Sequence, residues 1–322
     1  MKLTIEERQF FKVANPAGVI LFGRNIENPD QVKALINDLK ATFGRDVPIL
    51  IDQEGGRVRR LRPPHWRETP AMAVFEQIYK EDPQRALLAL ELNVKLLGME
   101  LKGLGINVNC LPVLDIPQPN ADPIISDRAF SSNLDLIIVM GKIVIDCLMS
   151  VGCLPVIKHI PGHGRALVDS HKELPRVDVS RETLEAEDFK PFKALSYAPF
   201  AMTAHIIYED IDPENEATFS KKIISEVIRK DIGFEGLLMS DDLGMNALSF
   251  DYATRAQKTF DAGVDLGLHC SGIIEEMREI ASVTPPMTNE NYNKLNKYLA
   301  LTNTTIDFEK DRAEAEYNKL VK

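Results

Sequence analysis

The chain has 322 residues, of which 44% are hydrophobic, so it is long enough to bury a substantial core. Its 38 Lys and Arg residues are outnumbered by 48 Asp and Glu residues, which makes nucleic acid or an anionic membrane surface a poor partner. The N-terminus has no signal-peptide pattern, and the apolar runs reach only strand length or are broken by charge, so we expect a soluble cytoplasmic protein.

Seven short apolar runs alternate with amphipathic segments along the chain. Their hydrophobicity is continuous, which is typical of strands that are buried on both faces of a parallel sheet. The first amphipathic segment begins at Asp30. We expect strands at 18–22, 47–52, 106–115, 153–159, 199–205, 236–242 and 264–270, and helices at 30–43, 81–104, 133–150, 181–195, 220–232 and 252–262.

Nearly every apolar run ends in a charged, amide or imidazole side chain. In an α/β fold of the (β/α)8 TIM-like barrel type, the C-terminal strand ends meet at one mouth, where active sites are built. A doubly wound sheet usually has a glycine-rich phosphate loop after its first strand, and no G-x-G-x-x-G follows the first run here. The sequence therefore predicts a single barrel domain over 1–322, with 288–322 as a C-terminal helical extension. Because only seven runs are visible, we expect the first strand to be missing or incomplete.

The densest group of reactive side chains extends from Lys158 to His171, in the glycine-rich segment KHIPGHGRALVDSH. One interpretation is a metal site of His159, His163 and His171 with Asp169, although ligands on a mobile loop are poorly preorganised. A second interpretation is a Schiff-base lysine at Lys158, which could equally donate hydrogen bonds to a sugar.

The third interpretation is an acid/base dyad of Asp169 and His171. These residues are two positions apart, so an extended backbone places both side chains on the same side. The carboxylate can then fix the imidazole tautomer, and histidine titrates close to neutral pH. The structural alternative is a loop cap in which Asp169 accepts backbone hydrogen bonds.

A carboxylate pair ends the run at 237–245, LLMSDDLGM. An aspartate at a strand end of a barrel points into the mouth and could attack an anomeric carbon. Alternatively, Ser240 or either aspartate could cap a helix. With two adjacent aspartates, one can attack while the other supports the structure.

The segment 52–61, DQEGGRVRRL, offers Asp52 as an acceptor for sugar hydroxyls. Its two glycines permit a tight turn after the strand. Arg57 and Arg60 follow, but a salt-bridged structural loop is an equally good interpretation of Arg57 and Arg59. Arg128, in the motif SDRAF, is a further polar group that means little alone.

With these motifs, the chain closely resembles the single-domain β-N-acetylhexosaminidases of glycoside hydrolase family 3, the bacterial NagZ type. The resemblance extends from about Glu6 to about Met277. It rests on GVILFGRNIENPDQ, IDQEGGRVRRLRPPHW, CLPVLD, SDRAF, KHIPGHGRALVDSH, MTAHIIYEDIDPENEATFS, IGFEGLLMSDDLGM and RAQKTFDAGVDL.

The resemblance implies a retaining glycosidase that needs no metal or organic cofactor. It implies Asp241 as the nucleophile, with Asp242 as the weaker candidate. It implies His171 as the acid/base and Asp169 as the residue that orients it. A histidine thus replaces one member of the usual carboxylate pair. The implied substrate-binding residues are Asp52, Arg60, Arg128, Lys158 and His159.

The implied substrate is N-acetylglucosamine β-1,4-linked to an anhydro-muramoyl sugar or its peptide derivative, a muropeptide of peptidoglycan recycling. The enzyme is expected to act as a monomer. Two alternatives are a β-glucosidase of the same broad family and an inactive sugar-binding barrel. β-Glucosidases generally take their acid/base from a second domain, whereas here the D-S-H loop supplies one within the barrel.

Two departures from the family pattern stand out. Ser126 occupies a position where relatives more often have glycine, which we interpret as a mild change in a surface loop. Relatives also carry a β-strand upstream of LTIEERQFF, whereas this chain begins with Met1 and Lys2. We therefore expect that translation starts at an upstream codon and that the native enzyme carries the additional strand.

Overall fold

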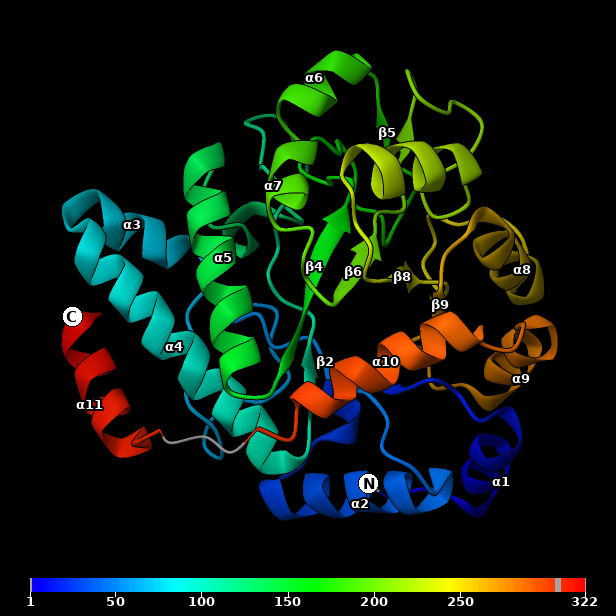
Figure 1. The fold of residues 1–322 in the computed structure, drawn as a ribbon, viewed down its shortest axis with the longest axis horizontal. Helices are drawn as coiled ribbons and strands as arrows, with labels where there is room; N and C mark the ends of the chain where they lie inside the picture. Colours follow the sequence, from blue (N-terminus) through cyan, green and yellow to red (C-terminus); the bar gives the residue numbers. More distant parts are fainter. Residues whose placement is uncertain (1, 305–307, 322) are drawn as a thin grey trace. The chain divides into compact units, whose positions relative to one another are not determined.

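The computed structural model describes residues 2–304 and 308–321. Its main sheet has seven strands in the order β1-β2-β3-β4-β6-β8-β9 (Figure 1). This is the predicted α/β fold of the TIM-like type, with β1 and β9 as the sheet edges among the described residues. The chain divides into two compact units, which we describe separately as unit 1 (1–112, 139–156 and 296–322) and unit 2 (113–138 and 157–295).

Unit 1 contains three short parallel strands and the first residues of a fourth. Val19 pairs with Ile49, and Asn109 pairs with both Ile51 and Pro155. β1, β2 and β3 are shorter than the apolar runs that predicted them, whereas β4 has the predicted length. In the run 106–115, the amide of Leu111 bonds back to the carbonyl of Asn109. The strands are β1 (Val19–Leu21), β2 (Ile49–Ile51), β3 (Val108–Asn109) and β4 (Leu154–Ile160), of which β4 continues into unit 2.

The helices of unit 1 begin and end at residues that the sequence marks clearly. In α4, the Asp82 side chain accepts the amide of Arg85, Pro83 takes the first helical position, and Gly105 ends the helix at φ 91°. Three helices here, α1, α3 and α11, lie outside the six predicted helical segments, although α11 falls in the predicted helical tail. The helices are α1 (Ile5–Ala14), α2 (Pro29–Phe43), α3 (Ala73–Glu81), α4 (Pro83–Leu104) and α11 (Lys310–Leu320).

Unit 2 continues the parallel sheet and carries most of the predicted reactive segments. Phe200 pairs with Leu237, and Met239 pairs with Leu266. A second sheet of two short strands, which the sequence did not predict, joins Arg176–Val177 to Ile207–Tyr208. The strands are β5 (Arg176–Val177), β6 (Phe200–Thr203), β7 (Ile207–Tyr208), β8 (Leu237–Asp242) and β9 (Leu266–Leu268).

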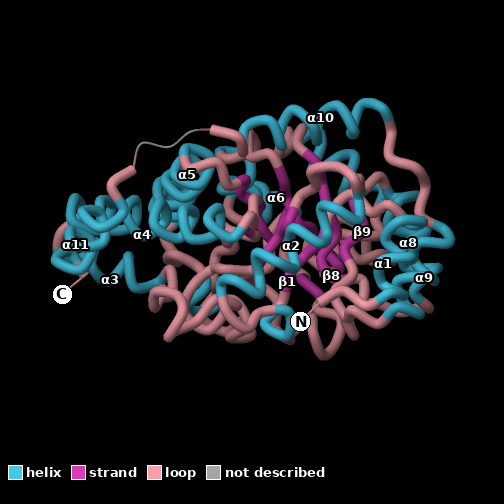
Figure 2. Tube along the Cα trace, turned by 90° about the horizontal axis from the view of Figure 1, so that it is seen from below, coloured by secondary structure: helices cyan, strands magenta, loops and turns pink. Residues whose placement is uncertain are grey.

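The helices of unit 2 follow the predictions with two exceptions, one of which is α9, a helix that the sequence did not predict. The segment 181–195 forms two helices instead of one, with the break at Glu187, whose carbonyl cannot accept a helical hydrogen bond from Pro191. Asp188, next to the break, forms an ion pair with Arg165 (Nε–Oδ2 2.6 Å). Helices α8 and α9 pack side by side (Figures 1 and 2). The helices are α6 (Arg181–Ala186), α7 (Phe189–Ala194), a π-type segment (Ile223–Asp231), α8 (Tyr252–Ala262) and α9 (Ile274–Val283).

Two helices belong to both units, α5 (Leu134–Ser150) and α10 (Asn289–Leu301). Within the predicted helical extension 288–322, α10 and α11 are helical as expected, and residues 305–307 and 322 lie outside the described residues. No helix in the described part of the chain is long and apolar enough to cross a membrane.

Two glycines of α4 offer a matched test of packing in unit 1. A Cβ at Gly98 would lie 2.5 Å from Val151 Cγ2, whereas a Cβ at Gly103 would meet nothing within 4 Å. We expect Gly98→Ala to lower the free energy of unfolding by about 1–3 kcal/mol through overpacking. Gly103→Ala should raise it by about 0.5–1 kcal/mol, because alanine is the better helix former. Urea unfolding followed by circular dichroism measures both; shifts of the same sign would contradict this packing.

Candidate active site

Asp241 lies near the end of β8, where the strand delivers its side chain among several imidazoles. Burial raises the pKa of Asp241, but the imidazoles of His159 and His205 and the amide of Asp242 together lower it below the usual value. Its Oδ1 accepts that amide at 2.8 Å. At neutral pH the side chain is therefore an ionised carboxylate, the form that a nucleophile requires.

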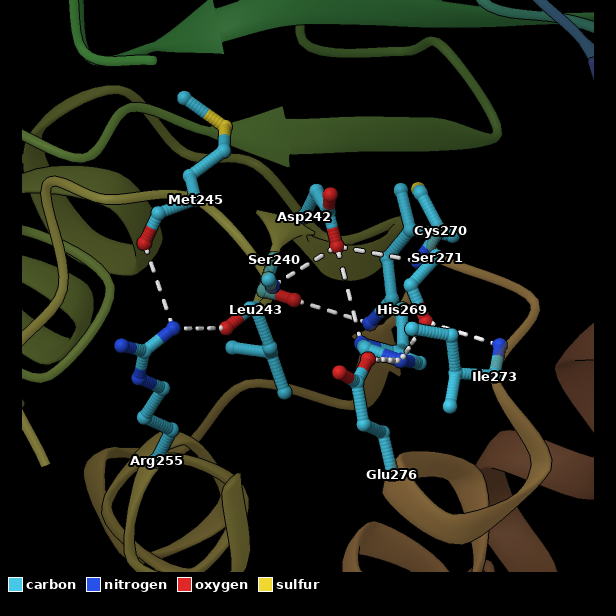
Figure 3. Close-up of polar contacts among 12 residues, drawn as sticks. Ser240, Asp242, Leu243, Met245, Arg255, His269, Cys270, Ser271, Ile273 and Glu276 are labelled. Carbon is cyan, nitrogen blue, oxygen red and sulfur yellow. Dashed lines mark hydrogen bonds and ion pairs between the residues drawn. The ribbon is translucent and has the colours of Figure 1, made fainter. Parts of the chain in front are cut away.

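The neighbouring Asp242 is held in a different way. Its Oδ1 accepts the amide of Gly244 at 2.8 Å and the amide of Cys270 at 3.0 Å, and it lies 3.8 Å from His269 Nδ1 (Figure 3). Because successive side chains of a strand point to opposite faces, Asp242 and Asp241 lie in different surroundings and contact different groups. The Asp242 carboxylate ties the end of β8 to the segment that follows β9.

The alternative that these residues cap a helix does not match the hydrogen bonds. The next helix, α8, is capped by Asp251, whose side chain accepts the amide of Thr254 at 2.8 Å. Ser240 instead accepts the amide of Leu268 through Oγ at 2.9 Å, which fastens β8 to β9.

Asp169 and His171 form the pair that their spacing predicted. Asp169 Oδ1 lies 2.8 Å from His171 Nδ1 and also accepts the amide of His171 at 2.9 Å. Burial raises the pKa of Asp169, but these two hydrogen bonds and the nearby charges lower it overall. Asp169 thus caps its own turn and also faces the imidazole, so the two alternatives describe one arrangement. With Nδ1 occupied, Nε2 is the ring nitrogen that can exchange a proton.

Asp115 is a buried carboxylate to which the sequence analysis gave no role. It accepts the amides of His159 and His163, and its Oδ2 lies 2.7 Å from His159 Nδ1. His163 Nε2 in turn lies 3.1 Å from the hydroxyl of Ser170, next to His171. The signal was present in the run CLPVLD, which ends in this aspartate, but its partners are 44 and 48 residues away.

His205, on the segment after β6, is the other functional candidate that the sequence analysis left without a role. Its Nδ1 lies 2.7 Å from Thr218 Oγ1, and its Nε2 lies 3.1 Å from the carbonyl oxygen of Asp242. Burial lowers the pKa of His205, although the carboxylates of Asp241 and Asp242 oppose the shift. A neutral His205 therefore supports the strand end that carries Asp241.

Two of the predicted binding residues in unit 2 are buried cations. Lys158 is 2% exposed at the end of β4, and Arg128 is 8% exposed and donates to the carbonyl of Ile124 at 3.2 Å. Buried cations are costly unless they are paired, so such residues commonly belong to functional sites. Ser126 in the same motif has φ 37°, the left-handed region, which explains why glycine suits this position.

Asp52 and Arg60 lie together in unit 1, with Arg60 Nη2 3.2 Å from Asp52 Oδ2. Arg59 instead forms an ion pair with Glu68, as the salt-bridged alternative expected. Gly55 makes the turn possible, since a Cβ there would lie 2.1 Å from the carbonyl oxygen of Pro70. The predicted Asp52 and Arg60 are thus held as a pair in one loop.

The four proposed metal ligands are divided among three separate pairs. His159 faces Asp115, His163 faces Ser170, and His171 faces Asp169. Within residues 2–304 and 308–321, no three His, Cys, Asp or Glu side chains are grouped so that they could hold a metal ion.

Comparison with known proteins identifies the family to which this chain is similar. The family described as Glycosyl hydrolase family 3 N terminal domain matches residues 1–294. The beta-hexosaminidase of Alkalilimnicola ehrlichii is 38% identical over 274 residues, which cover 84% of this chain and 78% of that protein. The beta-hexosaminidase of Bordetella avium is 33% identical over 291 residues, with coverage of 88% and 83%.

The fold has equally extensive counterparts among solved structures. NagZ from Neisseria gonorrhoeae in complex with N-trifluoroacetyl-D-glucosamine gives a TM-score of 0.87 at 30% identity, covering 100% of this chain and 95% of that one. A family 3 β-N-acetylglucosaminidase from Paenibacillus gives 0.85 at 26% identity, with coverage of 99% and 65%. The chain belongs to glycoside hydrolase family 3 and is an enzyme of the β-hexosaminidase type.

Proposed function

We propose that this enzyme is a retaining β-N-acetylglucosaminidase that acts in the cytoplasm as a monomer. Its substrate is terminal, non-reducing N-acetylglucosamine, β-1,4-linked to the anhydro-muramoyl sugar of a muropeptide in cell-wall recycling. The observation that carries the proposal is that one unit contains both an ionised strand-end carboxylate, Asp241, and the Asp169–His171 dyad. The sugar analogue bound to the Neisseria protein supports the choice of sugar.

Asp241 supplies the nucleophile in this mechanism. Because its Oδ1 accepts the amide of Asp242, Oδ2 is the oxygen that attacks the anomeric carbon. The bond from that carbon to the leaving oxygen breaks as the bond to Oδ2 forms, through an oxocarbenium-like transition state. The product is a covalent glycosyl-enzyme, as in other retaining glycosidases.

His171 carries the proton in both half-reactions. Its protonated Nε2 donates to the departing sugar oxygen, while Asp169 holds Nδ1 and stabilises the imidazolium. The neutral imidazole then takes a proton from water, whose oxygen attacks the anomeric carbon and releases Asp241. The His171 side chain is 60% exposed, which allows water to reach it.

Substrate binding is assigned to five residues. In unit 2, Arg128 and Lys158 are buried donors, and His159 is fixed by Asp115. In unit 1, Asp52 and Arg60 are proposed on the family resemblance together with their mutual hydrogen bond. Donors and acceptors with fixed orientation suit the hydroxyls of a sugar, because little ordering is required on binding.

The nucleophile is tested by Asp241→Asn, with Asp242→Asn as its matched neighbour. Asp241→Asn should lower kcat by several orders of magnitude, because the amide is a poor nucleophile. A 5-fluoro glycosyl fluoride of N-acetylglucosamine should label a peptide at Asp241, identified by mass spectrometry. Asp242→Asn should keep the label, since its carboxylate serves backbone amides. A label on Asp242, or near-normal turnover by Asp241→Asn, would refute the assignment.

Leaving-group dependence tests the dyad. His171→Ala should lower kcat/KM by about 10²–10⁴-fold for a disaccharide, because a sugar leaves poorly without a proton. Nitrophenolate needs little protonation, so the loss on the nitrophenyl glycoside should be much smaller. Asp169→Asn should show the same bias more weakly. The control is His65→Ala, an exposed histidine against Trp66 in unit 1. Equal losses on both substrates would mean that the dyad has only a structural role.

A further inference from the structure

The loop between β8 and α8, residues 243–250, is shaped by one arginine. Arg255, in the first turn of α8, donates to main-chain carbonyl groups throughout this 243–250 loop. All three guanidinium nitrogens take part, and Figure 3 shows the contacts to Leu243 and Met245. The acceptors are the carbonyl oxygens of Leu243 (2.6 Å), Met245 (3.2 Å), Leu248 (2.6 Å), Ser249 (3.2 Å) and Phe250 (3.0 Å).

The other side of the 243–250 loop is fixed by apolar packing. Leu243 and Leu248 are buried in a cluster with Ala256 of α8 and Ile280 of α9. The loop therefore has its carbonyls held by a charged donor and its apolar side chains held by the core. A segment fixed on both sides has few alternative conformations, so it can serve as a rigid support.

This support reaches the segment that carries the acid/base dyad. The amide of Ala247 donates to the carbonyl of Ser170 at 3.2 Å, and the side-chain amide of Asn246 donates to the carbonyl of His171 at 3.0 Å. Asn246 is exposed, whereas Ala247 is buried. The 243–250 loop thus connects the strand that carries Asp241 to the main chain of His171.

We propose that Asn246 and Arg255 are positioning residues of the glycosidase reaction. Arg255 sets the shape of the 243–250 loop, and Asn246 on that loop fixes the main chain of His171. The imidazole is thereby placed at a defined position relative to the strand of Asp241. This inference rests on the proposed function, in which His171 transfers the proton. Misplacement of a catalytic group by about 1 Å can cost roughly 10²-fold in rate.

The decisive variant is Asn246→Asp, which keeps the size of the side chain but replaces the N–H donor with an acceptor facing a carbonyl. We expect kcat/KM for N,N′-diacetylchitobiose to fall about 10- to 100-fold, and for the nitrophenyl glycoside less than about 3-fold. Asn246→Gln retains the donor and should recover part of the loss. Unbiased losses on the two substrates, or no loss on either, would overturn the proposal.

A matched control removes the same kind of donor elsewhere in unit 2. Asn291, on α10, donates through its side-chain amide to Asp265 Oδ1 at 2.8 Å. Asn291→Asp should lower the melting temperature without any leaving-group bias. Arg255→Lys keeps the charge but loses the planar set of donors, and it should show the bias of Asn246→Asp at a temperature where it is folded. Lack of bias in folded Arg255→Lys would remove Arg255 from the proposal.

His171→Ala, measured alongside, separates failure of this inference from failure of the proposed function. If His171→Ala shows no leaving-group bias, the acid/base assignment itself is wrong. If His171→Ala shows the bias and Asn246→Asp does not, only the positioning inference is wrong. In the His171→Ala background, Asn246→Asp should lower kcat/KM for the disaccharide by a further factor of less than about 2, because the imidazole that Asn246 positions has been removed. A full additive loss there would show that Asn246 acts through another group.

Discussion

The arrangement of unit 2 depends on one buried carboxylate, Asp115. Removing a carboxylate from water is costly unless hydrogen bonds and opposite charge compensate. Asp115 accepts the main-chain amides of His159 and His163 and faces the imidazole of His159. Burial raises the pKa of Asp115, but His159 and these bonds lower it below the usual value, so it stays ionised. The end of β4 and the loop after it are therefore fixed to one anion.

From Asp115 the constraint spreads along the glycine-rich loop. A Cβ at Gly164 would lie 1.9 Å from the carbonyl oxygen of Ile116, so glycine is needed here for close approach of two backbones. The main-chain N–H of Gln118 donates to the carbonyl of Gly164 at 3.2 Å. The first half of the loop is thus held by hydrogen bonds to Asp115 and Gln118. His163 and Ser170 then carry the constraint to the dyad.

Local signals predicted the elements well, and contacts distant in sequence decided the rest. The predicted helix 81–104 agrees with α4 to within two residues, and the cap at Asp82 and the stop at Gly105 are short-range features that fit it. The break within 181–195 lies at Glu187, four residues before Pro191, a local signal that helical periodicity alone does not register. Likewise, hydrophobic periodicity does not separate the adjacent aspartates at 241–242, whereas the amides of Gly244 and Cys270 that bind Asp242 do.

Burial also separates the histidines of unit 2 by what each can do. The side chains of His159, His163, His205 and His269 are almost fully buried, whereas that of His171 is 60% exposed. Burial lowers the pKa of His163 to about 4, so this imidazole stays neutral at physiological pH and acts as a hydrogen-bonding group. A residue that gives a proton to a leaving sugar and then takes one from water must be reachable by both. Of these imidazoles, His171 combines solvent access with a carboxylate on Nδ1. Because its side chain is not enclosed by packing, its position depends on hydrogen bonds to its main chain, such as the one from Asn246.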